Sequence, residues 1–140
     1  MSVQRLLLAI FIAGNLGTIT ELVFLEHYED GWQLVPFAVA LIGCTSAAWH
    51  ASARNQRSQR WFRMVLVLFA ISGVLGLALH FKGNLEFARE QDDALRGIAL
   101  IWEVLTGATP ALAPGMMAFL AAIGYAATRA SEVPLASSRS

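Results

Sequence analysis

The chain has 140 residues, of which 56% are hydrophobic and only 14% are charged. Charged residues make up about a quarter of an ordinary soluble domain, so this composition excludes a typical water-soluble protein and indicates an integral membrane protein. Ten basic and ten acidic residues give a formal net charge of zero, so the overall charge does not indicate a partner.

The apolar residues come in four blocks. Each block is close to the ~20 residues that a helix needs to cross the ~30 Å hydrocarbon layer of a membrane. We therefore predict an all-α integral membrane protein with four transmembrane helices, at about residues 6–27, 32–52, 62–81 and 109–128. These helices would form a single four-helix domain over residues 1–130, and residues 131–140 would be a disordered C-terminal tail.

Positive charge is distributed unevenly along the chain. Seven of the ten basic residues flank the N-terminus, the connection between the second and third helices, and the C-terminus, whereas the other two connections hold only Lys82, Arg89 and Arg96. The positive-inside rule then predicts a multi-pass protein of a bacterial-type inner (plasma) membrane, N-in and C-in. The four arginines of the second connection either anchor this topology, which is the simpler interpretation, or touch anionic lipid headgroups.

The first helix carries a carboxylate, Glu21, inside its apolar run. On a helical projection Gly14, Gly17, Glu21 and Tyr28 fall within roughly 60° of one another. Small residues let transmembrane helices approach closely, so we expect Gly14 and Gly17 to pack on another helix and Glu21 to point toward it. An ionisable side chain at this depth costs about 3 kcal/mol to insert, which makes it a functional hypothesis.

A Gly-x-x-Gly pair followed after four residues by an ionisable side chain occurs in both outward-running helices, as Gly14, Gly17 and Glu21 and as Gly73, Gly76 and His80. The two inward-running helices each open at a Leu-x-Pro sequence that ends in Pro36 or Pro114. These matches suggest a 2+2 parallel repeat about an axis along the membrane normal.

Depth counts place Glu21 and His80 at one level. Glu21 lies sixteen residues beyond Arg5, and His80 lies seventeen beyond Arg63, so both lie roughly 24 to 26 Å from the inner face. We therefore predict a candidate polar site at the outer side of the membrane, formed by Glu21, His80, His27, Asn84 and Glu86. The structural alternative is that Glu21 only fixes helix packing, through hydrogen bonds to Asn15, Thr18 or Thr20.

The motifs of known catalytic and cofactor sites are missing from the sequence. It has no Glu-x-x-His and no His pair at i, i+4, so no metal site is predicted. Bis-His haem ligation would need two imidazoles at one depth, but His27 is expected about 10 Å beyond Glu21, and His50 at the opposite face. We therefore expect no cofactor, assign no catalytic residue, and find no phosphate loop and no nucleic-acid-binding patch.

The second outer connection is long, from Lys82 to about Gly107. Gly83 and Asn84 predict a turn at its start. Apolar residues then recur at three-to-four spacing over residues 93–106, with Asp92 or Asp93 as N-cap, which predicts a short amphipathic helix on the periplasmic surface.

These features favour a non-enzymatic role. The leading hypothesis is a non-catalytic subunit or scaffold of a membrane assembly, embedded in the lipid bilayer as a homo-oligomer or with other membrane subunits. The alternative is a small carrier or sensor that binds a proton, ion or small ligand at Glu21 and His80. A metal-dependent membrane enzyme that uses the same pair with His27 and Glu86 is a weaker third hypothesis.

Overall fold

The computed structural model describes residues 1–107 and 113–130. Regular structure in these residues is entirely helical, which confirms the predicted all-α class. The elements are α1 (Val3–Phe24), a 3₁₀ turn η1 (Gly31–Gln33), α2 (Leu34–Ala53), α3 (Gln56–Gln91), α4 (Gly97–Thr106) and α5 (Gly115–Ala130). Three segments are long and apolar enough to cross a membrane: α1, η1 with α2, and α3.

The fourth predicted span, residues 109–128, corresponds to α5, which has 16 residues. Its predicted first residues, 109–112, lie outside the described residues, as does the predicted tail, 131–140. The first helix is displaced toward the N-terminus relative to the predicted 6–27, because α1 already ends at Phe24. The second agrees with its predicted 32–52 to within two residues at each end.

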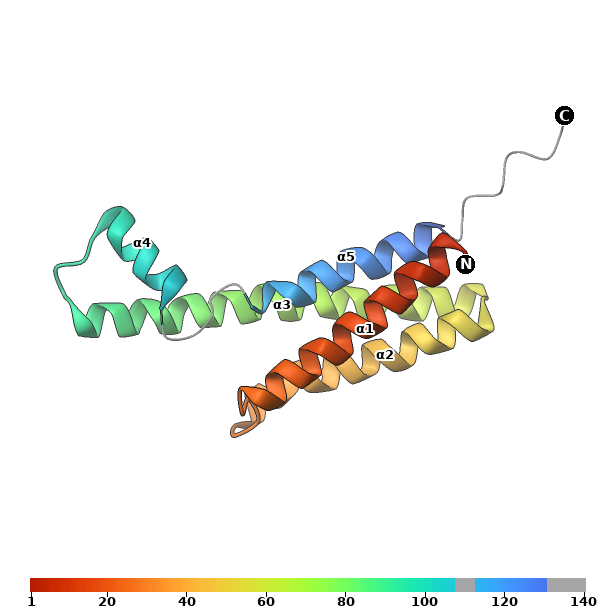
Figure 1. Ribbon diagram of the computed structural model, residues 1–140, viewed down its shortest axis with the longest axis horizontal. Helices are drawn as coiled ribbons and strands as arrows, with labels where there is room; N and C mark the ends of the chain where they lie inside the picture. Colours follow the sequence, from red (N-terminus) through yellow and green to blue (C-terminus); the bar gives the residue numbers. More distant parts are fainter. Residues whose placement is uncertain (108–112, 131–140) are drawn as a thin grey trace, which may run out of the picture.

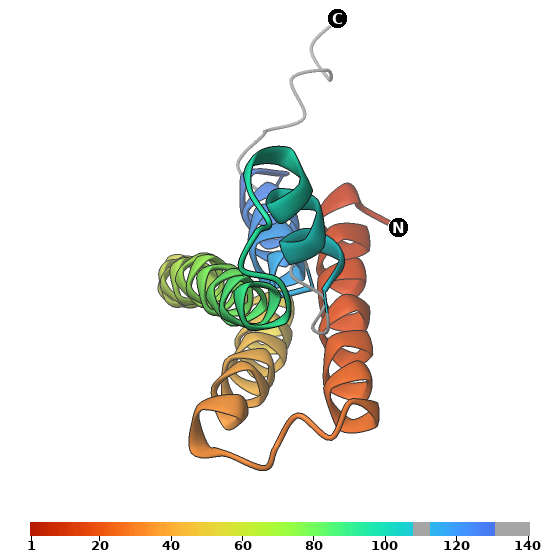
Figure 2. The same cartoon turned by 90° about the vertical axis from the view of Figure 1, so that its left-hand side faces the viewer.

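Helices α1, α2, α5 and the first half of α3 form an antiparallel bundle (Figures 1 and 2). Each of α1 and α3 packs against both α2 and α5, so α1 and α3 face each other across the bundle. The N-terminus, the α2–α3 turn and the end of α5 lie at one end of the bundle, and the α1–α2 turn lies at the other (Figure 1).

Three phenylalanine rings fill the centre of the bundle. Phe11 of α1 meets Phe62 of α3 edge to face, with ring centroids 5.3 Å apart, and lies at the same distance from Phe69 at a tilt of 47°. All three side chains are fully buried. Glycines make room on the other two helices. A Cβ at Gly43 of α2 would overlap the Phe69 ring, and a Cβ at Gly124 of α5 would overlap Leu66 and lie 3.2 Å from the Phe11 ring. Aromatic packing therefore ties the four helices together at their crossing point.

Helix α3 is longer than the predicted 62–81. It begins after Asn55, whose side chain accepts the Ser58 N–H at 2.9 Å as an N-cap, and it runs without interruption through the predicted turn at Gly83 and Asn84. The local turn signal is overridden because Asn84 is buried and donates its Nδ2 to the Val104 carbonyl at 2.8 Å. The 36 residues of α3 extend roughly 54 Å, well beyond a ~30 Å hydrocarbon layer.

The second half of α3 therefore projects from the bundle, and α4 folds back along it (Figure 1). We call residues 82–107 the outer arm. Helix α4 begins at Gly97, not at residue 93, and its N-cap Arg96 makes no capping bond. The predicted cap Asp92 instead ends α3 and accepts the Ala94 N–H at 2.8 Å, which forms the turn between the helices.

The four packing glycines lie in different environments. Gly73 and Gly76 lie against Pro114 at the start of α5, and Gly14 lies against Leu120 of the same helix. A Cβ at Gly17 would meet no atom within 4 Å. A 2+2 repeat would relate α1 to α3 and α2 to α5. Gly14 and Gly17 of α1 would then pack on α2, as Gly73 and Gly76 of α3 pack on α5. The repeat remains a prediction, and the packing of these glycines does not follow it.

Candidate functional site

Glu21 lies exposed on α1, one turn before the end of the helix. Among the described residues its carboxylate forms no ion pair and no hydrogen bond, with His80 or with any other side chain. The three neighbours that were expected to hold it bind their own helix instead. Asn15, Thr18 and Thr20 each donate to the carbonyl four residues earlier, at 2.8, 3.0 and 2.8 Å.

The structure brings His80 together with His27. Helix α1 ends in a Schellman motif, in which the His27 N–H donates to the Leu22 carbonyl at 2.9 Å and the Glu26 N–H to the Val23 carbonyl at 3.1 Å. Glu26 takes the left-handed position of this motif, with φ 52°. The chain thus turns back on itself, and the His27 ring centroid lies 6.2 Å from that of His80, with the ring planes tilted by 40°.

The count that places His27 about 10 Å beyond the Glu21 level rests on an assumption about α1 that the structure does not meet. It assumed that the helix continued to residue 27, whereas the left-handed Glu26 reverses the chain after Phe24. The two rings are in contact, and no hydrogen bond between their nitrogens occurs in the described part of the chain. No group of three or more His, Cys, Asp or Glu side chains that could hold a metal occurs in residues 1–107 and 113–130.

The remaining predicted site residues, Asn84 and Glu86, lie four and six residues beyond His80 on α3, at the start of the outer arm. Asn84 has a structural role, because its side chain is buried under α4 and bonded to the Val104 carbonyl. Glu86 is exposed and lies 3.6 Å from the Lys82 ammonium, one turn earlier on α3. Exposed i, i+4 pairs of this kind contribute about 0.3 to 0.5 kcal/mol, so this contact does little beyond supporting the helix.

A second polar cluster, at the opposite end of the bundle, was not predicted. His50 of α2 is buried, with its Nδ1 3.2 Å from the Ser58 Oγ and its Nε2 3.3 Å from the Gln4 Nε2. Its ring stacks on Phe62 at 5.8 Å. The cluster depends on the tight turn at Arg54, whose left-handed φ of 46° brings the first turn of α3 back to His50.

The same end of the bundle joins α3 to α5. Arg63 donates its Nε to the Thr128 Oγ1 at 3.0 Å and lies 5.7 Å from the centre of the Tyr125 ring. Gln59 donates to the Thr128 carbonyl at 3.2 Å. Polar side chains from all four bundle helices thus close the core at this end, as interhelical hydrogen bonds commonly do in membrane proteins. The sequence signal was the polar spacing in the first two turns of α3, where Gln59 and Arg63 lie four residues apart on one face.

Comparison with known proteins gives no relative from which a role could be transferred: no protein-family model, curated protein or solved structure matches this chain.

Proposed function

We propose that this chain is a small polytopic inner-membrane protein, with four spans and both termini inside, and that it serves as a non-catalytic subunit or scaffold of a membrane assembly. The supporting observation is the outer arm, which carries an apolar surface that residues 1–107 and 113–130 leave exposed.

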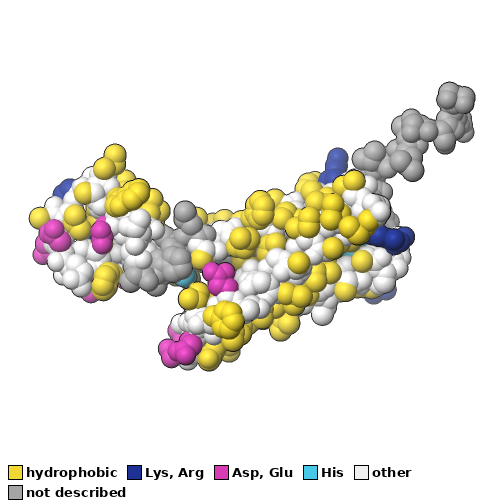
Figure 3. All heavy atoms as spheres, viewed as in Figure 1, with side chains coloured by type: hydrophobic (Ala, Val, Ile, Leu, Met, Phe, Trp, Pro, Cys, Tyr) yellow, Lys and Arg dark blue, Asp and Glu magenta, His cyan; other side chains and the backbone are white. Residues whose placement is uncertain are grey.

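The distribution of charge supports this orientation. In Figure 3, basic side chains gather at the end of the bundle that holds the N-terminus, while acidic side chains lie at the α1–α2 turn and on the outer arm. Yellow apolar side chains cover the bundle face between them. Arg63 and Lys82 lie nineteen residues apart on α3, roughly 28 Å, which matches the thickness of a bilayer core. The outer arm therefore lies outside the membrane.

Helix α4 packs on α3 through one face only. Val104 is fully buried there, next to Asn84 and Ala88 of α3. The other face is an exposed apolar stripe at i, i+3, i+4 and i+7 spacing, with Ile98 87% and Trp102 68% exposed, which we call the α4 stripe: Ile98, Ile101, Trp102 and Leu105. A helix that is apolar on both faces and lies outside the membrane buries its second face on a partner.

The mass of the detergent-solubilised assembly tests this proposal. We expect a species larger than the 15.2 kDa monomer, and we expect Ile98→Glu and Trp102→Glu to shift it toward monomer by at least about tenfold in association constant. Gln91→Glu is the matched control, because it adds the same charge at an exposed position of the arm. A wild-type protein that is monomeric in mild detergent would contradict the proposal.

The His27–His80 contact favours a second candidate function, a small carrier or sensor. Two imidazoles from different helices can share a proton or bind a soft or borderline metal ion, at the end of the bundle that also carries the exposed Glu21. This version of the hypothesis replaces the predicted Glu21–His80 pair with a histidine pair, and Glu21 becomes a neighbouring charge.

Metal titration of the purified protein tests this candidate. Cu⁺ or Zn²⁺ should raise the thermal midpoint of the wild type, and His27→Gln should abolish the increase. His50→Gln serves as the control, because this histidine lies at the other end of the bundle. If the increase is absent, or survives His27→Gln, no ion site of this kind exists.

A further inference from the structure

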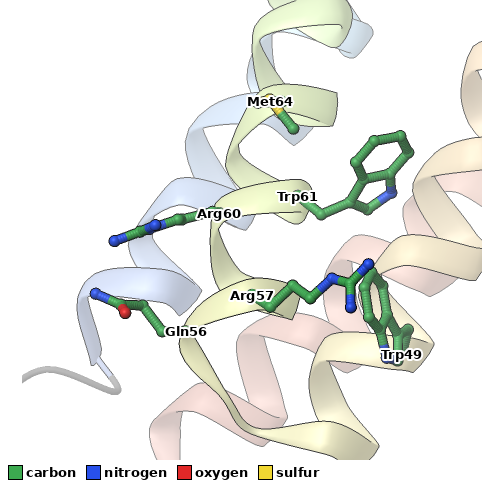
Figure 4. A pocket seen from close by; sticks show the side chains of 6 residues that line it. All are labelled: Trp49, Gln56, Arg57, Arg60, Trp61 and Met64. Atoms are coloured by element: carbon green, nitrogen blue, oxygen red, sulfur yellow. The ribbon is translucent and has the colours of Figure 1, made fainter.

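A pocket of about 540 Å³ opens beside the α2–α3 turn, at the end of the bundle that holds the N-terminus. Figure 4 shows that Arg57 extends alongside the Trp49 ring, while Trp61 and Met64 lie further along α3. The residues that line it come from the end of α2 and the first three turns of α3: Trp49, Gln56, Arg57, Arg60, Trp61 and Met64.

The charge of this pocket is not compensated within the described part of the chain. No Asp or Glu occurs in the sequence between Asp30 and Glu86. Neither Arg57 nor Arg60 forms an ion pair or a hydrogen bond with any other residue of the chain that the structure describes. The two arginines lie three residues apart on one helix. Figure 4 shows that Arg57 extends toward Trp49 and Arg60 extends to the other side of α3, so Arg60 reaches an anion beside Arg57 by a change of rotamer.

The start of α3 adds to this positive potential. Asn55 satisfies the Ser58 N–H, but the N–H groups of Gln56 and Arg57 precede the first helical acceptor and have no partner within the helix. Such N–H groups and the helix dipole stabilise a bound anion, and guanidinium groups match the oxygens of a phosphate in paired hydrogen bonds. The chemistry of the pocket therefore fits a phosphate group.

The apolar wall of the pocket indicates where that phosphate comes from. Trp49 and Trp61 are 41% and 47% exposed, at the depth where transmembrane helices carry their interfacial aromatic residues. Met64 is also exposed and begins the long apolar run of α3. The pocket thus changes from basic to apolar along α3, in the same direction as a phospholipid changes from headgroup to acyl chain.

We propose that this pocket binds one anionic phospholipid. Arg57 and Arg60 contact the phosphate oxygens, the two indole rings line the glycerol region, and Met64 lies against the first acyl carbons. A free phosphate would use only the basic half of the site, so the ligand is a lipid of the inner leaflet. The occupancy of the site would depend on the anionic lipid content of the membrane, independently of the assembly role of the α4 stripe.

Native mass spectrometry tests the proposal with protein solubilised in micelles that contain equal amounts of phosphatidylglycerol and phosphatidylcholine. The wild type should retain one phosphatidylglycerol in preference to phosphatidylcholine. Arg57→Gln with Arg60→Gln should lower its retention at least tenfold, while Arg57→Lys with Arg60→Lys should retain more lipid than the glutamine variant. The control is Arg89→Gln with Arg96→Gln, which removes the same charge from the outer arm and should leave retention unchanged.

Three results would overturn the proposal. Equal retention of the two lipids would show that the pocket does not recognise the anionic headgroup. An equal loss in the Arg89 and Arg96 control would show that net charge, and not the pocket, retains the lipid. Displacement of the lipid by millimolar glycerol phosphate would show that the ligand is a soluble phosphate. The four arginine positions are exposed, so unchanged helical circular dichroism should accompany each variant.

Discussion

The packing at Gly43 makes a sharp test of the bundle. Gly43 is buried on α2, and a Cβ at this position would lie 2.6 Å from Cε2 of Phe69, would overlap Cζ of the same ring, and would lie 3.3 Å from the Phe11 ring. Carbon atoms pack at about 3.5 to 4.0 Å, so Gly43→Ala forces the Phe69 ring to move by about 1 Å. That ring is fully buried against Phe11 and has no open side into which to move.

We expect Gly43→Ala to lower the free energy of unfolding by about 1 to 3 kcal/mol, the usual cost of overpacking a well-filled core. Gly17→Ala is the matched control in another apolar helix, because no atom lies within 4 Å of its Cβ position. Alanine is the better helix former by up to about 1 kcal/mol, so the control should be neutral or more stable. Reversible denaturation of detergent-solubilised protein in SDS, followed by circular dichroism, measures both values.

A compensating substitution tests whether the clash with the Phe69 ring causes the expected loss of stability. Phe69→Leu removes the ring that the added methyl group of Gly43→Ala would displace. The double variant should therefore be more stable than the sum of the two single changes predicts, by about 1 kcal/mol or more in a double-mutant cycle. Equal stability of Gly43→Ala and Gly17→Ala, or strictly additive effects in the cycle, would refute the packing described for the bundle centre.

Three further substitutions test the helix ends and the arm. Glu26→Gly should raise the thermal midpoint, because glycine adopts the left-handed φ without strain, which stabilises the folded protein by up to about 1 kcal/mol. A lower midpoint would contradict the Schellman turn. Asn84→Ala should speed backbone hydrogen exchange in α4 but not in α1, since it removes the bond to Val104; unchanged exchange would mean that other contacts hold the arm. Ser58→Ala should lower the free energy of unfolding by about 1 to 3 kcal/mol, because it leaves the Nδ1 atom of buried His50 without its partner. The control Ser52→Ala, at an exposed position, should change this free energy little.

The membrane character and the approximate positions of the helices could be predicted from the sequence, because apolar block length is a strong local signal. The full extent of α3 could not be predicted from the sequence. Gly83 and Asn84 favour a turn locally, and the contact of Asn84 with Val104, twenty residues away, favours the continuous helix. Tertiary contacts of this kind regularly override local preference.

The candidate site was only partly predictable, for a related reason. Counting residues along an ideal helix placed Glu21 and His80 at one depth, but depth along an axis does not determine which residue faces which. The His27–His80 contact depends on a left-handed backbone at Glu26, a position where glycine is the usual residue, so the residue type there does not indicate the reversal. The buried His50 cluster likewise depends on the left-handed Arg54.

The continuity of α3 has a mechanical consequence. One unbroken helix carries the arginines of the pocket near its first residue, the central rings at Phe62 and Phe69, and the outer arm at its far end. The distance from Ser58 to Asn84 is twenty-six residues, roughly 39 Å of stiff rod. A force on the outer arm is therefore transmitted to the aromatic core along a single helix, with no loop between residues 82 and 69.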